Sequence, residues 1–283
     1  MGAAAPEEET ATMATTPTTG RSGTFLWEGR RLAYEEYGEG DRVLLYLHGI
    51  LMDSEMNRGL ATALAARGHR VVLLDLLGHG QSDKPTHASE YRMDTYALQV
   101  AACLDHLGIE EALIGGVSLG ANVSLQVAVR APSRVTALIL EMPVLEWAVP
   151  AAAMLFTPLV LGLHYARPVF RAVAAVASRF PNTPIPALNS AVRGFSVPPD
   201  SMASVLHGVL VGPVAPSADE RGQIKAPTLV IAHKRDLIHP FSDAENLVEQ
   251  LPDAELVPAN NAAELRIFPD RLTGEIATFL DRF

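Results

Sequence analysis

The chain has 283 residues, of which 48% are hydrophobic and 19% charged, and its formal net charge is −10. This composition is typical of a globular protein with a substantial core and excludes a disordered chain. The negative net charge argues against a nucleic-acid-binding protein, because phosphates require a basic surface.

The first segment, residues 1–22, is rich in Ala, Thr and Glu and has no apolar periodicity, so we expect a flexible tail. It lacks the basic start and apolar centre of a secretory signal. Pro6 stands where a myristoylation motif needs Ser or Thr. We therefore expect a cytoplasmic protein.

Strands and helices are expected to alternate from residue 24 to Glu141. Two short runs joined by a Glu28-Gly29 turn predict an antiparallel edge hairpin. Short continuous apolar runs predict buried strands. The expected strands are 24–27, 31–37, 43–47, 71–74, 112–117 and 135–140, and the expected helices are 56–67, 94–107 and 120–130.

The alternation returns near the C-terminus, with strands expected at 228–232 and 255–257 and helices at 241–251 and 270–283. Strands that alternate with helices at this spacing predict an α/β fold. We expect a mostly parallel sheet of about eight strands covered by helices on both faces. The predicted core comprises residues 23–142 and 222–283.

Residues 143–221 interrupt this alternation with an apolar, helical pattern rich in Ala, Val, Leu and Pro. The insertion falls at the carboxyl edge of the predicted sheet, where ligands bind in open α/β sheets. We interpret it as a helical cap, or lid; a helical domain with no role in binding is the alternative.

One run in the predicted cap, residues 147–163, is apolar throughout but short for a stable membrane span. It also contains Pro150 and Pro158, so a buried or surface-lying helix is favoured. The apolar surface of such a helix would also suit a homodimer, in which two chains pair through it.

The most informative motif is Gly116-Val117-Ser118-Leu119-Gly120, which joins an expected strand to an expected helix. A strand that turns sharply into a helix through a serine strains that residue and requires small neighbours. The hydroxyl of Ser118 would then lie beside the positive N-terminal end of a helix, a position that suits a catalytic nucleophile.

Four motifs in this order resemble those of the α/β-hydrolase superfamily, specifically its lidded members of the esterase, lipase and epoxide-hydrolase type. The resemblance runs from about residue 24 to the end. The motifs are the serine turn, Leu47-His48-Gly49-Ile50, the glycine loop from Asp75 to Asp83, and the strand Ala226–Ala232 that leads to Asp236. Serine at position 118 excludes the usual chemistry of epoxide hydrolases and haloalkane dehalogenases, which use aspartate there.

The resemblance implies that Ser118 is a nucleophile that forms an acyl-enzyme. It also implies that the backbone N–H groups of Ile50 and Leu119 form an oxyanion hole. Asp236 would be the acid that orients a catalytic histidine, with Glu141 as the reserve.

The histidine itself is missing from the place where the family has it, the loop after the last strand. None of the nine histidines lies beyond His239, and Ala262 stands at or near the vacant position. His48 and His79 lie in the first two loop motifs, where we expect structural roles. Losing the histidine of a serine-protease triad costs roughly six powers of ten in rate.

Three explanations remain open. In the first, another histidine is the base: His239 is favoured, because it lies three residues after Asp236, over His164 and His207 of the cap. In the second, alanine at position 262 replaces a histidine. In the third, the chain is a natural member that has lost or altered hydrolysis and uses its pocket for binding or other chemistry.

The predicted function is a serine hydrolase of the esterase or lipase type with an atypical or impaired triad, acting on a lipophilic carboxylic ester or related acyl substrate. The alternative is a non-hydrolytic protein of the same fold that binds a small apolar ligand. No dinucleotide-type glycine loop and no cysteine–histidine zinc spacing is present, so we expect no cofactor and no metal. The single cysteine, Cys103, is expected to be a core residue.

Overall fold

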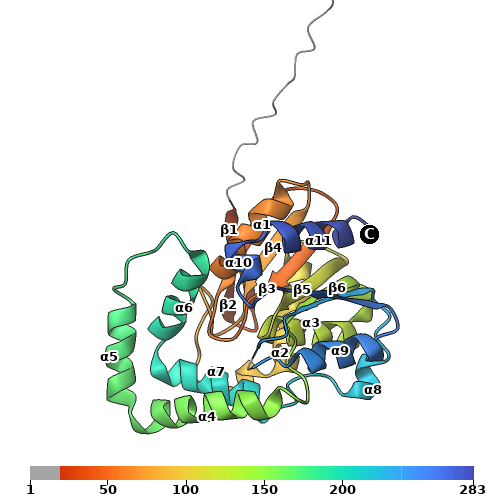
Figure 1. The fold of residues 1–283 in the computed structure, drawn as a ribbon. Coiled ribbons are helices and arrows are strands. Elements are labelled where there is room, and N and C mark those ends of the chain that lie inside the picture. The colour runs from red at the N-terminus through yellow and green to blue at the C-terminus, as the bar shows by residue number, and fades with distance from the viewer. Residues whose placement is uncertain (1–19, 237) are drawn as a thin grey trace, which may run out of the picture.

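The computed structural model describes residues 20–236 and 238–283, so most of the expected tail lies outside the described residues. Eight strands form a sheet in the order β1-β2-β4-β3-β5-β6-β7-β8 (Figure 1). β2 runs antiparallel to β1 and β4, and the other neighbours are parallel. The strands are β1 (Arg21–Trp27), β2 (Arg30–Tyr37), β3 (Val43–Leu47), β4 (Arg70–Asp75), β5 (Ala112–Val117), β6 (Val135–Glu141), β7 (Thr228–Ala232) and β8 (Ala254–Pro258).

Helices cover both faces of this sheet, which confirms the predicted fold class. Side chains of α2, α3 and α9 join the core on one face, and those of α1 and α11 join the core on the other. Cys103 of α2 is fully buried in the first of these cores, as expected. The helices are α1 (Arg58–Ala65), α2 (Met93–His106), α3 (Leu119–Arg130), α4 (Val149–Tyr165), α5 (Arg167–Ala177), α6 (Pro186–Ser196), α7 (Pro199–Val211), α8 (Ala218–Arg221), α9 (Phe241–Gln250), α10 (Glu264–Ile267) and α11 (Asp270–Leu280).

Most observed elements lie within about three residues of the expected ranges, and two of the differences are informative. β1 begins at Arg21, which pairs with Glu36 of β2, so the sheet starts before residue 23. The Arg21 guanidinium donates to the Glu36 carboxylate at 2.6 Å. The helix expected at 56–67 is a 3₁₀ turn, Ser54–Asn57, followed by α1. The Asp53 side chain accepts the N–H of Glu55 and so starts that turn early.

The register of the parallel strands positions the site. Leu47 pairs with Gly116, Val117 pairs with Glu141, and Glu141 pairs with Ile231. The carboxyl ends of β3, β5, β6 and β7 therefore meet at one edge of the sheet. The segments after these strands carry the residues singled out in the sequence.

Helices α4–α7 form the insertion between β6 and β7 and lie beside this edge (Figure 1). α6 is tied to the loop after β3: Arg193 contacts the Asp53 carboxylate at 2.6 and 3.0 Å, and Asp53 N–H donates to Ser190 Oγ at 2.8 Å. The start of α4 is held by buried Asp243 of α9, whose carboxylate accepts three backbone N–H groups of residues 145–148. α8, by contrast, contacts α3 and α9 of the core.

No single helix among the described residues is long and apolar enough to cross a membrane. Only α4 and α5 together have the length and apolar composition of a membrane span, and they are bent by 103° relative to each other.

Candidate active site

The serine turn has the strained geometry that its sequence predicts. Ser118 has φ +53° and ψ −108°, in the left-handed half of backbone space that L residues rarely adopt. A Cβ on Gly116 would lie 2.7 Å from the backbone of Gly120, and a Cβ on Gly120 would lie 2.7 Å from Leu47. β5 and α3 therefore approach closely enough to require glycine at positions 116 and 120.

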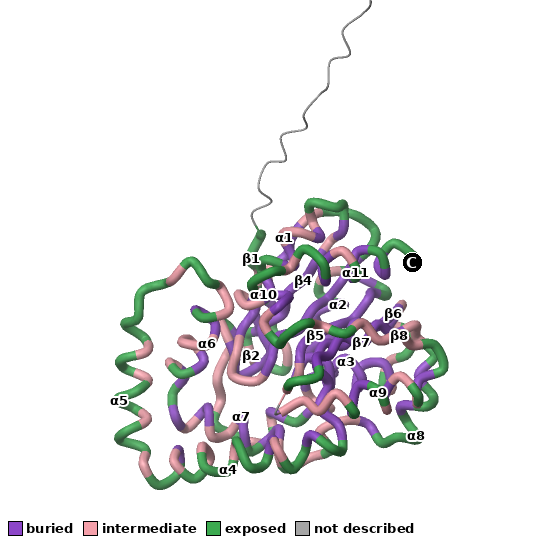
Figure 2. The backbone as a smooth tube through the Cα atoms, in the orientation of Figure 1, coloured by how far each residue is buried: buried purple, intermediate pink, exposed green. Residues whose placement is uncertain are grey.

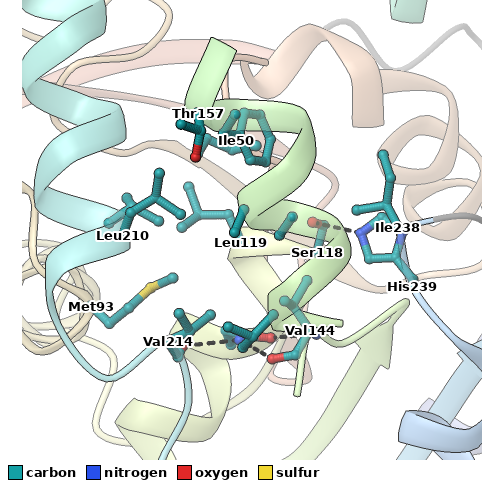
Figure 3. A pocket seen from close by; sticks show the side chains of 16 residues that line it. Ile50, Met93, Ser118, Leu119, Val144, Thr157, Leu210, Val214, Ile238 and His239 are labelled. Atoms are coloured by element: carbon teal, nitrogen blue, oxygen red, sulfur yellow. Dashed lines mark hydrogen bonds between the residues drawn. The ribbon is translucent and has the colours of Figure 1, made fainter. Parts of the chain in front are cut away.

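Ser118, His239 and Asp236 form one chain of hydrogen bonds. Ser118 Oγ lies 2.9 Å from His239 Nε2, and His239 Nδ1 lies 2.9 Å from Asp236 Oδ2 (Figure 3). Ser118 comes from the turn after β5, whereas the other two residues come from the loop after β7. The structure thus brings together the three side chains that the sequence singled out.

The Asp236 carboxylate is held by both of its oxygens. Oδ1 accepts the backbone N–H groups of Ile238 and His239 at 2.8 and 3.0 Å, and Oδ2 accepts Nδ1–H of His239. Burial by itself would raise the pKa of this carboxyl, but these hydrogen bonds and the nearby imidazole outweigh burial and hold the pKa well below its usual range. Asp236 is therefore ionised and oriented toward the imidazole.

Ile50 and Leu119 lie beside Ser118 and both line the same cavity. Their backbone N–H groups donate to no other group within residues 20–236 and 238–283, and Leu119 is the first residue of α3. α6 of the cap packs closely against the turn after Ile50: a Cβ on Gly194 would overlap the carbonyl oxygen of Leu51.

A cavity of about 270 Å³ opens onto Ser118 and His239 (Figure 3). α4 and α7 of the cap form part of its wall, and most of the side chains that line it are aliphatic. They are Ile50, Met93, Ser118, Leu119, Asn122, Val144, Val149, Ala152, Ala153, Phe156, Thr157, Val209, Leu210, Val214, Ile238 and His239.

The polar side chain of Asn122 is occupied with the backbone around it. Its amide nitrogen donates to the carbonyl oxygens of Val144 and Val214 at 2.7 and 2.9 Å, and its oxygen accepts the N–H of Val144 at 2.9 Å. It therefore joins the two ends of the cap insertion and offers no free amide to a ligand. The other polar side chains that line the cavity are Ser118, His239 and Thr157 of α4.

Ala262 does not belong to this arrangement. It lies exposed in a turn after β8 and is not among the cavity-lining residues. Glu141, the reserve acid, is bound instead by Arg266 at 2.8 and 3.2 Å and by Tyr46 Oη at 2.9 Å. Glu141 therefore bonds to Arg266 and Tyr46 in a buried cluster and not to a histidine.

Among the described residues, none of the other histidines considered in the sequence hydrogen-bonds to Ser118 or lines the cavity. His48 and His79 are buried and contact the backbone carbonyls of Gly49 and Leu77, and burial lowers the pKa of His79 well below its usual value. His164 and His207 of the cap are exposed, and neither lines the cavity.

Three residues near the site were missed by the sequence analysis: Asn122, Asp243 and His233. His233 is buried, and its Nε2 lies 3.0 Å from the Asp236 oxygen that also binds His239, without hydrogen-bond geometry. The symmetric spacing His233-x-x-Asp236-x-x-His239 was a visible signal for it. Asn122 and Asp243 act on segments far along the chain, and their sequence context carries no such signal.

Comparison with known proteins identifies the fold family of the chain. Residues 42–267 match the family model described as "alpha/beta hydrolase fold". "AB hydrolase superfamily protein YisY" of Bacillus subtilis (strain 168) is 27% identical over 256 residues, which cover 85% of this chain and 91% of that protein. "Uncharacterized protein Rv2715" of Mycobacterium tuberculosis is 42% identical over 112 residues, but the match covers only 40% of this chain and 32% of that protein.

Solved structures share the whole fold at low sequence identity. The enol-lactonase from Burkholderia xenovorans LB400 has a TM-score of 0.75 and 21% identity, with 92% of this chain and 100% of that chain covered. A thermophilic esterase from Thermogutta terrifontis has a TM-score of 0.72 and 23% identity, with 93% and 98% covered. Because the family model matches residues 42–267, which is most of the chain, the chain belongs to the α/β-hydrolase fold family.

Proposed function

We propose that this protein is a carboxylic ester hydrolase that acts on lipophilic esters through an acyl-enzyme. The observation that carries the proposal is the continuous chain of hydrogen bonds from Ser118 Oγ through His239 to Asp236. A serine hydroxyl becomes a useful nucleophile when an adjacent base takes its proton and a third group orients that base.

In the proposed mechanism, His239 Nε2 takes the hydroxyl proton while Ser118 Oγ attacks the ester carbonyl. Asp236 stabilises the imidazolium that forms, and the N–H groups of Ile50 and Leu119 bind the oxyanion. The tetrahedral intermediate collapses, His239 gives the proton to the departing alcohol, and the acyl group remains on Ser118. Water, activated by the same histidine, then releases the acid and restores the serine.

The substrate class follows from the cavity. Its walls are aliphatic, the amide of Asn122 is occupied, and its size lies near the lower end of typical ligand sites, about 300–1,000 Å³. We therefore propose a small or medium-chain acyl group with little polarity. The esterase and the enol-lactonase among the structural neighbours are named for activities on ester bonds, which supports the choice of bond.

The proposed base, His239, follows β7 and not the last strand, which makes the triad atypical in sequence. All three kinds of side chain, a serine, a histidine and a carboxylate, are nevertheless present. Ala262 is exposed and outside the cavity, so a histidine lost from that position is not needed to account for the site.

A panel of p-nitrophenyl esters of increasing acyl length tests the proposal, together with labelling of Ser118 by a fluorophosphonate probe. We expect turnover that peaks at short or medium chains, with labelling abolished in Ser118→Ala. An unlabelled serine and no turnover across the panel would contradict the proposal and favour a non-hydrolytic pocket that binds a small apolar ligand.

A further inference from the structure

The outer half of the cap exposes an unusual amount of apolar surface. α5 has no buried residue, and α4 buries only Ala152 and Leu163. Most of the exposed large hydrophobic side chains in the described part of the chain lie between residues 147 and 211. Figure 2 shows α5 as exposed or intermediate along its whole length at the rim of the molecule.

The exposed side chains of α5 are ordered on one face. Val169, Val173 and Val176, with Phe180 just beyond the helix, recur at spacings of four, three and four residues and are 60%, 41%, 63% and 59% exposed. This spacing places them in one stripe. With Val192 and Phe195 of α6 they line an open groove of about 500 Å³.

α4 exposes a second apolar stripe while its other side faces the cavity. Met154, Leu161 and Tyr165 are 80%, 50% and 80% exposed. They are seven and four residues apart, which places them on one face of the helix. Phe156 of the same helix lines the cavity that contains Ser118. The surface and the cavity are therefore two sides of one helix.

The charge of this region is opposite to that of the rest of the chain. Residues 147–199 contain four arginines and no lysine, aspartate or glutamate, although the whole chain has a net charge of −10. Arg167 lies 3.4 Å from Asp200, and Arg193 is bound to the core. Arg171 and Arg179 have no carboxylate within 4.0 Å among the residues that the structure describes.

We propose that α4 and α5 dock this protein onto an anionic phospholipid bilayer, with both helices lying in the interface. An apolar helix face can insert into the acyl region of a bilayer, and arginines without neighbouring acidic residues bind anionic headgroups. Trp147 and Tyr165, near the two ends of α4, are residue types enriched at that depth. The 103° bend, and the failure of either helix alone to reach a spanning length, fit helices that lie on the membrane.

A second copy of the chain fits this surface less well. Pairing cap against cap would bring the unpaired arginines of both copies together, and like charges in an interface are costly. A bilayer supplies both the apolar layer and the negative charge. The proposal does not depend on the hydrolytic activity.

Flotation of the full chain with vesicles tests the proposal. We expect co-flotation with phosphatidylcholine vesicles containing phosphatidylglycerol, weaker binding to pure phosphatidylcholine, and weakening by salt. The variant Met154→Gln/Val173→Gln/Val176→Gln should lose most of the binding. The matched control Leu26→Gln/Leu98→Gln, which changes leucines that are 76% and 55% exposed on the core, should keep it.

The charge contribution has its own pair of variants. Arg171→Gln/Arg179→Gln should weaken partitioning to anionic vesicles by about 25-fold, since each arginine near such a surface contributes about fivefold. Lys225→Gln/Arg282→Gln carries the same change of charge on the core and should not. Circular dichroism of each variant checks the fold.

Three outcomes would overturn the proposal: no flotation of the wild type with anionic vesicles, equal loss of binding in the core controls, or a dimer by light scattering that the α4/α5 variant abolishes while vesicle binding is absent. The last outcome would assign the surface to a second copy.

Discussion

The loops after β7 and β8 leave the sheet at the same edge, from neighbouring parallel strands, yet they hold different groups. The loop after β7 carries both Asp236 and His239, and His239 reaches Ser118. The segment after β8 carries exposed Ala262 and then Arg266, which is buried against Glu141. The difference between the two loops shows that a catalytic triad is recognised by the geometry of its side chains and not by their positions in the sequence.

Removing His239 should have the largest effect. His239→Ala takes away the proposed base, so we expect kcat on a p-nitrophenyl ester to fall by about six powers of ten, as in serine proteases without their histidine. The matched control is His233→Gln, which changes a buried histidine beside the same carboxylate but without a hydrogen bond to Ser118. Equal losses in the two variants would show that the base is not His239.

Asp236→Asn should come next. The amide cannot stabilise the imidazolium and favours the wrong tautomer of His239, so we expect a loss of about 10⁴-fold in kcat with little change in KM. Steady-state assays across the ester panel measure both constants. If activity is unchanged, another carboxylate orients the histidine.

A substitution in the segment after β8 should lower the stability of the protein and not its catalytic rate. Arg266→Met leaves Glu141 as an uncompensated charge whose side chain is 4% exposed, so unfolding free energy should fall by about 3–5 kcal/mol. Denaturant titration measures this. The double variant Glu141→Gln/Arg266→Met should recover much of the loss, because it removes the buried charge; a double variant no more stable than the single would contradict that account.

The pH dependence of stability should distinguish Asp236 from an exposed carboxyl. Its folded pKa lies below the ordinary value of 3.8, so its stabilising contribution is complete above that pH and is lost as the pH falls further. The stability difference between wild type and Asp236→Asn should therefore be larger near neutral pH than below pH 3.8. A difference that does not change in acid would rule out this linkage.

The smallest effect is expected at the other loop. Ala262→His places an imidazole on an exposed turn outside the cavity, so kcat should not change, and His239→Ala/Ala262→His should not regain activity. Recovery in the double variant would mean that the loop after β8 can still deliver a base to Ser118.

Much of the fold was predictable because its signals are local. Continuous apolar runs marked β3, β5 and β7 with bounds that the structure reproduces, and the Gly116–Gly120 turn predicted the backbone strain at Ser118. The roles of Asn122 and Asp243 were not predictable, because each bonds to backbone brought near only by the insertion of the cap.

The sequence by itself determined the order of strands and helices, the place of the strained serine and the candidate acid three residues before a histidine. Each of these depends on neighbours along the chain, through side-chain periodicity and local sterics. Only the tertiary structure decided which histidine meets Ser118, because the two residues are 121 positions apart and meet through the register of β5, β6 and β7. It also decided which apolar faces of the cap are covered, because burial depends on the packing of α4 to α7 and not on composition.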